Sequence, residues 1–199
     1  MPNCPGNPVS TTISEILKHS HQLIAVSDTA RLDVEILLGH VLEKDRSFLY
    51  TWPEHPLNAD QYRRFQALFE RRLLGEPVAH LVGYREFWSL SLKVSAATLI
   101  PRPETELLVE LALELTLGDE PAILDLGTGT GAIALALASE KQSWHVSAVD
   151  ASEEAVALAQ ENRQQLGLEG VQVFQSNWFS DVAEQQFDLI VSNPPYICV

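Results

Sequence analysis

A glycine-rich turn between an apolar run and a helical run constrains the fold of this chain most. Residues 122–126 form the apolar run, and residues 132–140 carry the Ala and Leu that favour a helix. The glycines between them follow the spacing Gly-x-Gly-x-Gly, which differs from the Gly-x-Gly-x-x-Gly of dinucleotide-binding folds. Such a turn is typical of a nucleotide site, because glycine allows close approach and free N–H groups at a helix start suit a polar ligand. The candidate ligand-binding residues are Gly127, Thr128, Gly129, Thr130 and Gly131.

The alternation of strand and helix continues after this turn. Apolar runs at 146–149, 171–174 and 187–191 indicate strands, and residues 152–166 have a helical pattern. Strands that alternate with helices imply right-handed crossovers and a parallel sheet, so we expect an α/β fold of the Rossmann-like kind. Ligands bind at the carboxyl ends of the strands in such sheets, and the functional residues are expected there.

Two residues at these strand ends are candidates for binding a nucleoside. Asp150 ends the second strand, 19 positions after Gly131, where a carboxylate can accept the hydrogens of both ribose hydroxyls. It can instead cap the following helix, a role for which Ser152 competes. Trp178 follows the third strand and can pack on a flat adenine, although a tryptophan at such a place more often belongs to the core.

The last strand leads into the sequence Asn193-Pro194-Pro195-Tyr196. Asn193 precedes a proline, which favours an extended backbone, and the prolines cannot continue a ladder because they lack an N–H group. Their carbonyls remain acceptors, so the strand ends in a stiff group of hydrogen-bond acceptors beside an aromatic ring. The motif marks either a binding site or a simple strand terminator with a packing tyrosine.

The first part of the chain has helical spacing and no catalytic grouping of side chains. Residues 13–17 begin a first helix, and a second is expected from Thr29 to Glu43. A third follows Asn58, a plausible N-cap, and ends at Gly75. We expect a small helical bundle.

A β-hairpin and a proline-punctuated loop are expected between the bundle and the parallel sheet. Residues 85–94 are rich in β-formers and alternate in part, which suggests the hairpin. The loop 99–106 opens a helix that we expect from about Glu104 to Leu117. The loop is either a linker before a well-capped helix or a stiff support that holds Arg102 and Glu104 over a pocket.

Composition disfavours several classes of function. The net charge of −14 disfavours a partner held by phosphate contacts, and the one candidate basic patch is better explained as the solvated face of a helix. The two cysteines have no metal-ligand spacing and fit a reduced, cytosolic compartment. We find neither a secretory pattern in the first ten residues nor an apolar run of about 18 residues. The patch consists of Arg63, Arg64, Arg71 and Arg72, and the cysteines are Cys4 and Cys198.

The glycine turn, Asp150 and the last-strand motif together resemble the class I S-adenosylmethionine-dependent methyltransferases. The Asn-Pro-Pro-Tyr signature resembles the branch that methylates planar exocyclic nitrogens, which includes adenine methyltransferases of DNA and RNA and protein-glutamine methyltransferases. Four further stretches are similar to the HemK/PrmC family, whose members methylate the glutamine of the Gly-Gly-Gln motif in class I peptide-chain release factors. These stretches are residues 33–38, 75–81, 85–88 and 99–106.

The resemblance implies a cofactor and the residues that hold it. S-adenosylmethionine would lie with its methionyl part on the glycine turn, its ribose on Asp150 and its adenine near Trp178, and it would leave as S-adenosylhomocysteine. Asn193 would contact both the cofactor and the substrate. Asn177 departs from the pattern, because the family carries an acid at that position, and this departure concerns the adenine contacts.

The same resemblance implies three catalytic residues, Asn193, Pro194 and Tyr196. The side-chain oxygen of Asn193 and the carbonyl of Pro194 would accept the two hydrogens of the glutamine amide, which holds the nitrogen in line with the methyl group. Tyr196 would pack against the substrate side chain, and Pro195 would complete the substrate-binding motif.

The resemblance also implies how the chain is organised. We expect a flexible N-terminus at 1–11, a helical bundle that binds the release factor at 12–76, a hairpin linker at 77–103 and a partial methyltransferase domain at 104–199. Because family members continue with further strands, we expect a C-terminally truncated chain and a sheet that is incomplete at that end. We expect a monomer in the bacterial cytoplasm that acts on release factors, without nucleic-acid or membrane partners.

Two alternatives stay open at the level of sequence. An adenine-N6 methyltransferase of DNA or RNA shares the tetrapeptide, but the charge balance and the helical bundle count against it. A non-catalytic cofactor-binding fragment is the second alternative, since the chain ends three residues after Tyr196.

Overall fold

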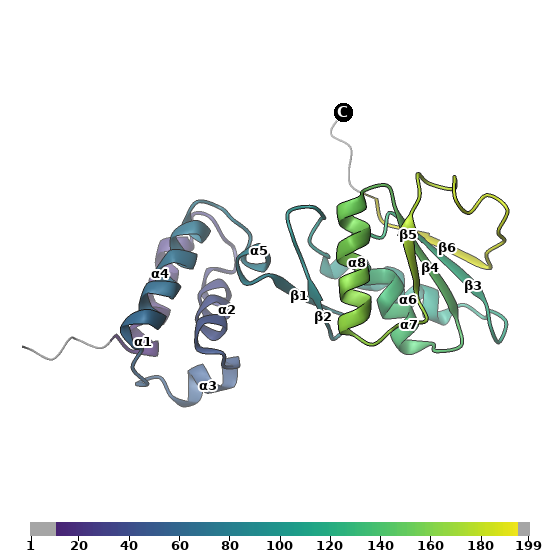
Figure 1. The fold of residues 1–199 in the computed structure, drawn as a ribbon. Helices are drawn as coiled ribbons and strands as arrows, with labels where there is room; N and C mark the ends of the chain where they lie inside the picture. The colour runs from purple at the N-terminus through teal and green to yellow at the C-terminus, as the bar shows by residue number, and fades with distance from the viewer. Residues whose placement is uncertain (1–10, 195–199) are drawn as a thin grey trace, which may run out of the picture. The chain divides into compact units, whose positions relative to one another are not determined.

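The computed structural model describes residues 11–194. Pro195, Tyr196 and both cysteines lie outside the described residues, as does most of the expected flexible N-terminus. The chain divides into two compact units, Met1–Val82 and Gly83–Val199 (Figure 1). The division falls within the segment that the sequence predicts as a linker.

The first unit is helical in its described part, as the sequence predicts. Its elements are α1 Ile13–Leu17, η1 Lys18–Leu23, α2 Ala30–Leu42, α3 Arg46–Thr51, α4 Ala59–Leu73 and α5 Val78–Val82. The three predicted helices are present as α1, α2 and α4, and capping boxes at Thr12 and Asn58 begin α1 and α4. The short helices η1, α3 and α5 have no counterpart among the sequence-based predictions. Asp45 begins α3 by accepting the Phe48 N–H, so a capping signal was present there.

The core of the first unit combines apolar side chains from α1, α2 and α4. Ile13, Val34, Leu37 and Phe65 are fully buried in it. On α2 the buried Val34, Leu37, Leu38 and Val41 recur at the helical period, which is the pattern that predicts a helix packed on a core.

Glu35 is a buried carboxylate at the edge of this core, and cationic side chains neutralise it. Its side chain is 1 % exposed and accepts hydrogen bonds from Arg31 Nε at 2.8 Å, Arg46 Nε at 3.0 Å and the Tyr50 hydroxyl at 2.6 Å. Burial acts to raise the pKa of Glu35, but the three hydrogen bonds outweigh it, so the pKa is lowered.

The expected patch of four arginines contains one buried ion pair. Arg72 Nε donates to Asp33 Oδ2 at 2.8 Å, and the two side chains are 11 % and 8 % exposed. Arg63 and Arg71 remain more than half exposed. Arg63 pairs with Asp60 on the same helix, and Arg71 pairs with Glu76, which follows the helix. The interpretation as a solvated face is therefore confirmed for Arg63 and Arg71 and wrong for Arg72, which holds α4 against α2.

The second unit begins with the predicted hairpin. Strand β1, Tyr84–Phe87, pairs antiparallel with β2, Leu90–Lys93. The two turn residues, Trp88 and Ser89, have φ values of 51° and 60°, which is the backbone that a two-residue hairpin turn of the primed type requires. The Trp88 N–H donates to Glu106 Oε1 at 2.9 Å, which ties the turn to the helix that follows the proline loop.

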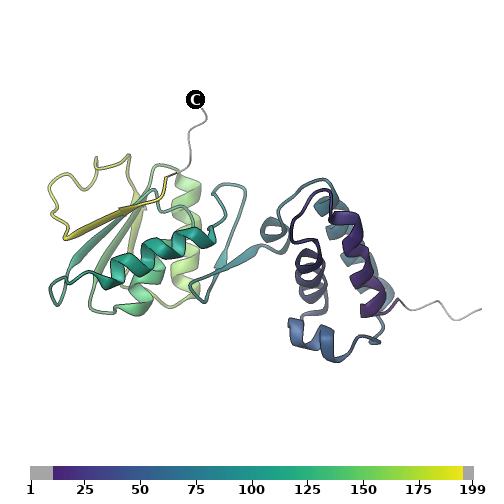
Figure 2. The ribbon, with the colours of Figure 1, turned by 180° about the vertical axis from the view of Figure 1, so that it is seen from behind.

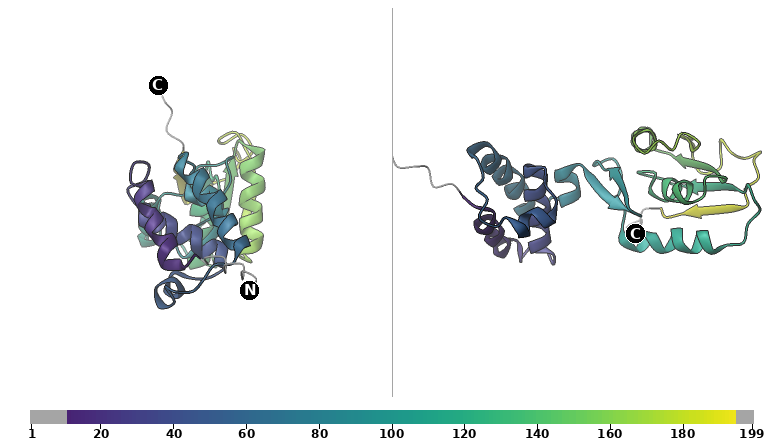
Figure 3. Two further views of the ribbon diagram at one scale, coloured as in Figure 1. Left: turned by 90° about the vertical axis from the view of Figure 1, so that its left-hand side faces the viewer. Right: turned by 90° about the horizontal axis from the view of Figure 1, so that it is seen from below.

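A four-stranded parallel sheet forms the rest of the second unit, as the sequence predicts. The strands are β3 Ala122–Leu126, β4 His145–Asp150, β5 Gln172–Gln175 and β6 Leu189–Ser192, and the helices are η2 Pro103–Thr105, α6 Glu106–Glu114, α7 Ala132–Glu140 and α8 Glu153–Gln165. The strand order is β5-β4-β3-β6, and every neighbouring pair is parallel. In the register, Leu126 pairs with both Val149 and Ser192, so three strands end side by side (Figures 2 and 3).

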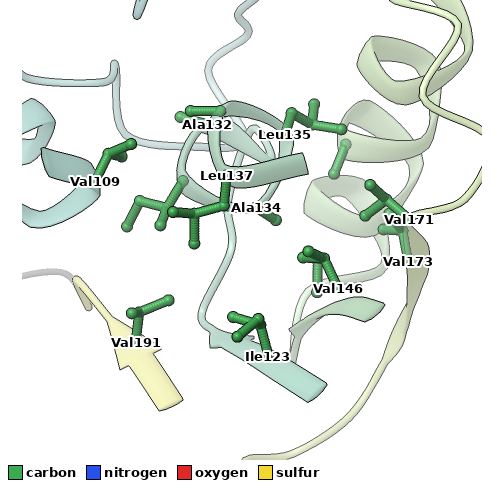
Figure 4. Packing of buried hydrophobic residues seen from close by; sticks show 14 of the residues in the cluster. Val109, Ile123, Ala132, Ala134, Leu135, Leu137, Val146, Val171, Val173 and Val191 are labelled. Atoms are coloured by element: carbon green, nitrogen blue, oxygen red, sulfur yellow. The ribbon is translucent and has the colours of Figure 1, made fainter. Parts of the chain in front are cut away.

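The helices α6, α7 and α8 pack against one face of this sheet. Ile123, Val146, Val173 and Val191 point from the four strands into a single apolar cluster with side chains of the three helices (Figure 4). A smaller cluster on alternate strand residues includes Leu124 and is closed by the segment between β5 and β6. In the described part of the chain, no helix has the length and apolarity needed to cross a bilayer.

Candidate cofactor and substrate site

A pocket of about 960 Å³ lies at the carboxyl ends of β3, β4 and β6. Its volume is within the range of small-molecule sites, and its position is the one expected for an open α/β sheet. The predicted residues on its wall are Gly127, Thr128, Gly129, Thr130, Asp150, Trp178, Asn193 and Pro194. Gly131 is the one described candidate that does not line the pocket.

The glycine turn offers close approach rather than a row of free donors. Gly127 and Gly129 have φ values of 72° and 56°, and a Cβ on Gly127 would meet nothing within 4 Å. Their N–H groups and those of Thr128 and Gly131 donate to carbonyls or to a carboxylate of the protein. The expectation that N–H groups of this turn are free is therefore wrong for these four residues. The turn supplies a bare backbone surface against which a ligand can lie.

Gly131 serves the packing of the helix behind the turn. Its φ is 83°, and a Cβ would lie 3.0 Å from Leu135 and 3.3 Å from Ala159. A side chain there would push α7 away from α8. Glycine at this position is therefore explained by the left-handed backbone and by the close packing of α7 and α8.

Asp150 is held at the pocket wall by two backbone N–H groups. Its Oδ2 accepts from Gly129 N–H at 2.9 Å and its Oδ1 from Ser152 N–H at 3.0 Å. The helix cap is Ser152, whose hydroxyl accepts from the Ala155 N–H at 3.2 Å, so the capping alternative for Asp150 is wrong. Each carboxylate oxygen has a second lone pair, and Asp150 retains the capacity to accept hydroxyl hydrogens.

Trp178 stands at the pocket with a backbone that tryptophan rarely adopts. Its φ is 54° and the residue is 57 % exposed, so the alternative that it belongs to the core is wrong. The buried Ser176 hydroxyl donates to the Trp178 carbonyl at 2.8 Å and holds this conformation. Asn177 lines the same pocket.

The end of β6 brings Asn193 and Pro194 to the opposite wall. Ser192 Oγ donates to the Leu126 carbonyl at 2.8 Å, which fixes the end of β6 to the end of β3. Asn193 Nδ2 donates to Thr105 Oγ1 at 2.9 Å. Pro195 and Tyr196, the remaining two predicted residues of the motif, lie outside the described residues.

Two family models match the chain, and their boundaries follow the division into two units to within one residue. The PrmC N-terminal domain matches residues 15–83, and the methyltransferase small domain matches residues 103–197. Three curated relatives are each named release factor glutamine methyltransferase. The protein from Shewanella oneidensis is 58 % identical over 93 % of this chain and 65 % of its own length. The one from Pseudomonas aeruginosa is 55 % identical over 94 % and 67 %, and the one from Aliivibrio fischeri is 51 % identical over 95 % and 68 %.

The chain belongs to the release factor glutamine methyltransferase family. It spans about two thirds of the length of these relatives. The predicted fold class, a Rossmann-like α/β sheet with a helical bundle and a hairpin, is confirmed by the described elements.

One polar residue that sequence reasoning missed in this family member is Asp125. It lies within β3, is 0 % exposed, and accepts a hydrogen bond from the Thr128 hydroxyl at 2.6 Å. Burial raises the pKa of Asp125 to about 6, and the hydrogen bonds from Thr128 and the Ala134 N–H only partly offset it, while the nearby Asp150 charge adds to the rise. A single acid inside an otherwise apolar strand was the available signal.

Asn162 is a second missed residue, and it joins two walls of the site. It is fully buried on α8, where its Nδ2 donates to the carbonyls of Thr130 at 2.9 Å and Lys93 at 3.1 Å. Its Oδ1 accepts from the Lys93 N–H at 2.7 Å. The amide thus holds the glycine turn of this family member to the strand that leads into the pocket segment 96–102.

The proline loop also borders the pocket. Arg102 and Glu104 both line it, as the functional alternative for this loop predicts. Thr98 stands over Gly129, and its hydroxyl is buried without a hydrogen-bond partner among the described residues. Among those residues no group of three or more His, Cys, Asp and Glu side chains forms a metal site.

Proposed function

We propose that the gene product transfers a methyl group from S-adenosylmethionine to the side-chain amide nitrogen (N5) of the glutamine in the Gly-Gly-Gln motif of class I release factors. The observation that carries the proposal is the placement of Asn193 and Pro194 in the same pocket as the glycine turn and Asp150. The names of the curated relatives support the acceptor.

The residues present fit S-adenosylmethionine. Asp150 has acceptor capacity for ribose hydroxyls, the exposed Trp178 offers an aromatic face for adenine, and the bare turn at Gly127 and Gly129 allows the methionyl part to lie close. The buried and unpaired hydroxyl of Thr98 is a further polar group for this ligand. When bound, the cofactor supplies an electrophilic methyl group on sulfur, and S-adenosylhomocysteine is the product.

The chain's own task is to hold a weakly nucleophilic amide nitrogen. An amide lone pair is delocalised into the carbonyl, so the nitrogen must be fixed with one face toward the methyl group. Asn193 Oδ1 and the Pro194 carbonyl accept the two N–H hydrogens in this proposal, and they stabilise positive charge that develops on nitrogen during transfer. Pro195 and Tyr196 complete the substrate contact, and the nitrogen then releases its extra proton to solvent.

The helical unit is the proposed binding element for the release factor. The match of residues 15–83 to the PrmC N-terminal domain supports it. We further propose a monomer in the bacterial cytoplasm without nucleic-acid or membrane partners.

The acceptor is tested with the full-length gene product, methyl-labelled cofactor and a class I release factor. Label should enter the release factor and be absent when its Gly-Gly-Gln glutamine is replaced by alanine. DNA and RNA serve as parallel acceptors. Label in nucleic acid with none in the release factor would replace this proposal by an adenine-directed activity, and calorimetric binding of cofactor without any turnover would identify a binding module.

Asn193→Ala tests the site. We expect the transfer rate to fall by at least about a hundredfold, because one of two preorganised acceptors is lost, while the cofactor Kd changes far less. Steady-state kinetics and calorimetry measure the two quantities. A loss of cofactor affinity as large as the loss of rate would show that Asn193 acts on the cofactor alone.

A further inference from the structure

Thr105 occupies a capping position without capping. It is the residue before α6, where a threonine side chain ordinarily accepts a hydrogen bond from one of the first backbone N–H groups of the helix. The Thr105 side chain makes no such bond, and its backbone is already in the helical region because η2 leads directly into α6. Local structure therefore does not explain the position of its hydroxyl. The residue as a whole is 9 % exposed.

The hydroxyl instead contacts a residue 88 positions away. Thr105 Oγ1 accepts from Asn193 Nδ2 at 2.9 Å, and both residues line the pocket. An asparagine amide carries its donor and its acceptor on opposite sides of one carbon, and rotation about the last torsion exchanges them. While the Thr105 hydroxyl accepts from the nitrogen, as it does in the structure, the oxygen lies on the other side of the amide.

We propose that Thr105 is the positioning residue that fixes the side-chain amide of Asn193 with Oδ1 available to the substrate. The inference deepens the proposed function and rests on it, because it assigns Oδ1 as the acceptor for the substrate amide. With the amide reversed, Asn193 would present N–H groups to the N–H groups of glutamine, and two donors facing each other repel. A fixed amide avoids that arrangement before the substrate arrives.

The segment that carries Thr105 is itself anchored. The next residue, Glu106, accepts the Trp88 N–H, so the start of α6 is tied to the hairpin turn. The partner, Asn193, follows β6, whose end is tied to β3 through Ser192. Thr105 and Asn193 thus approach each other from two supported elements, which favours a persistent contact.

Two substitutions separate the hydrogen bond from packing. Thr105→Val keeps the shape and removes the acceptor, whereas Thr105→Ser keeps the acceptor and removes a methyl group. In the gene product with release factor, we expect Thr105→Val to lower kcat roughly tenfold or more with the KM for the cofactor nearly unchanged, and Thr105→Ser to stay within about threefold of the unsubstituted protein. Thr116→Val, an exposed threonine outside the pocket, is the matched control.

A double-mutant cycle shows whether Thr105 acts through Asn193. If it does, Thr105→Val in an Asn193→Ala background adds no further loss of kcat, because nothing is left to position. Losses that multiply, or an unchanged kcat in Thr105→Val alone, would overturn the proposal. Equal thermal unfolding midpoints for Thr105→Val and Thr105→Ser exclude a difference in folding as the cause.

An NMR measurement tests the contact without any turnover. The Asn193 side-chain NH2 signals are assigned by their absence in Asn193→Ala. We expect Thr105→Val to move this pair toward the positions of solvent-exposed asparagines and Thr105→Ser to leave it in place. An unmoved pair in Thr105→Val overturns the positioning role even if no release factor is methylated, and a moved pair together with an unmethylated release factor assigns the failure to the proposed function.

Discussion

The two units shift the pKa of a buried carboxylate in opposite directions. In the first unit, burial acts to raise the pKa of Glu35, but hydrogen bonds from Tyr50, Arg31 and Arg46 lower it. In the second unit, burial raises the pKa of Asp125 to about 6, and the groups that act on it are a hydroxyl, a backbone N–H and another carboxylate, none of them cationic. A cation that pairs with a buried acid holds it in one place in the structure. An acid that is hydrogen-bonded only by neutral donors can still accept further hydrogen bonds, or can bind and release a proton.

This contrast distinguishes buried acids that pair with arginines from the acid on the pocket wall. The acids of the first unit lie between helices, and their arginines satisfy them. Asp150 lies on the pocket wall, where two N–H groups orient it without neutralising it. The helical unit thus contains buried carboxylates paired with arginines, while the sheet unit has polar groups at the strand ends on the pocket wall.

The largest expected effect comes from removing the cation that pairs with a buried acid in the first unit. Arg72→Ala leaves Asp33 buried without its cation, and we expect a loss of about 3–5 kcal/mol in the free energy of unfolding of the first unit. Hydrogen exchange of peptides from α2 and α4 measures this unit separately from the sheet. The cofactor Kd should not change.

Arg63→Ala is the matched control for Arg72→Ala. It removes an exposed partner from an exposed acid on the same helix, and such pairs contribute about 1 kcal/mol at most. Equal losses for the two substitutions would contradict the structural role assigned to the buried pair.

The second prediction concerns Asp125. An acid whose pKa is higher in the folded than in the unfolded protein binds its proton more tightly when folded, so its contribution to stability is full below pH 3.8 and is lost as pH rises through about 6. Asp125→Asn keeps an oxygen for the Thr128 hydroxyl and does not titrate. As the pH rises from 3.8 to about 6, we expect the free energy of unfolding of the variant to increase by on the order of 2–3 kcal/mol relative to that of the parent.

Urea unfolding in a Trp52→Phe background follows the second unit alone, because the other three tryptophans lie in it. The quantity to compare is the difference in unfolding free energy between the two proteins at each pH. A difference that stays constant from pH 4 to pH 7 would show that Asp125 does not titrate in this range.

Local patterns in the sequence predict the elements that have strong periods and caps. The helix after Asn58, the hairpin, strand 122–126 and helix 132–140 follow from spacing, turn residues and composition. The short helices η1 and α3 lack a long period, and they form because the surrounding bundle buries their apolar side chains.

Contacts between distant residues are the part that sequence could not predict. Asn162 and Thr105 carry no signal of their own, and their partners lie 69 and 88 positions away. The occupied N–H groups of the glycine turn likewise depend on Val149 and Asp150 of the neighbouring strand. The strand-end candidates were predictable because a parallel sheet places them together, whereas the side chains that orient them come from elements whose approach only the fold determines.

The smallest expected effect sharpens the contrast at Asp150. Asp150→Asn keeps one oxygen for a backbone N–H and replaces the other by an NH2 group, so it can no longer accept hydrogens on both sides. We expect the Kd for S-adenosylmethionine to rise about tenfold, which corresponds to about 1.4 kcal/mol, with hydrogen exchange of β3 and β4 nearly unchanged. Titration calorimetry measures the Kd, and Asp119→Asn, which alters an exposed acid before β3, is the control. If affinity stays the same while the sheet loses protection, Asp150 resembles Glu35 after all, and its two N–H bonds to Gly129 and Ser152 are its whole function.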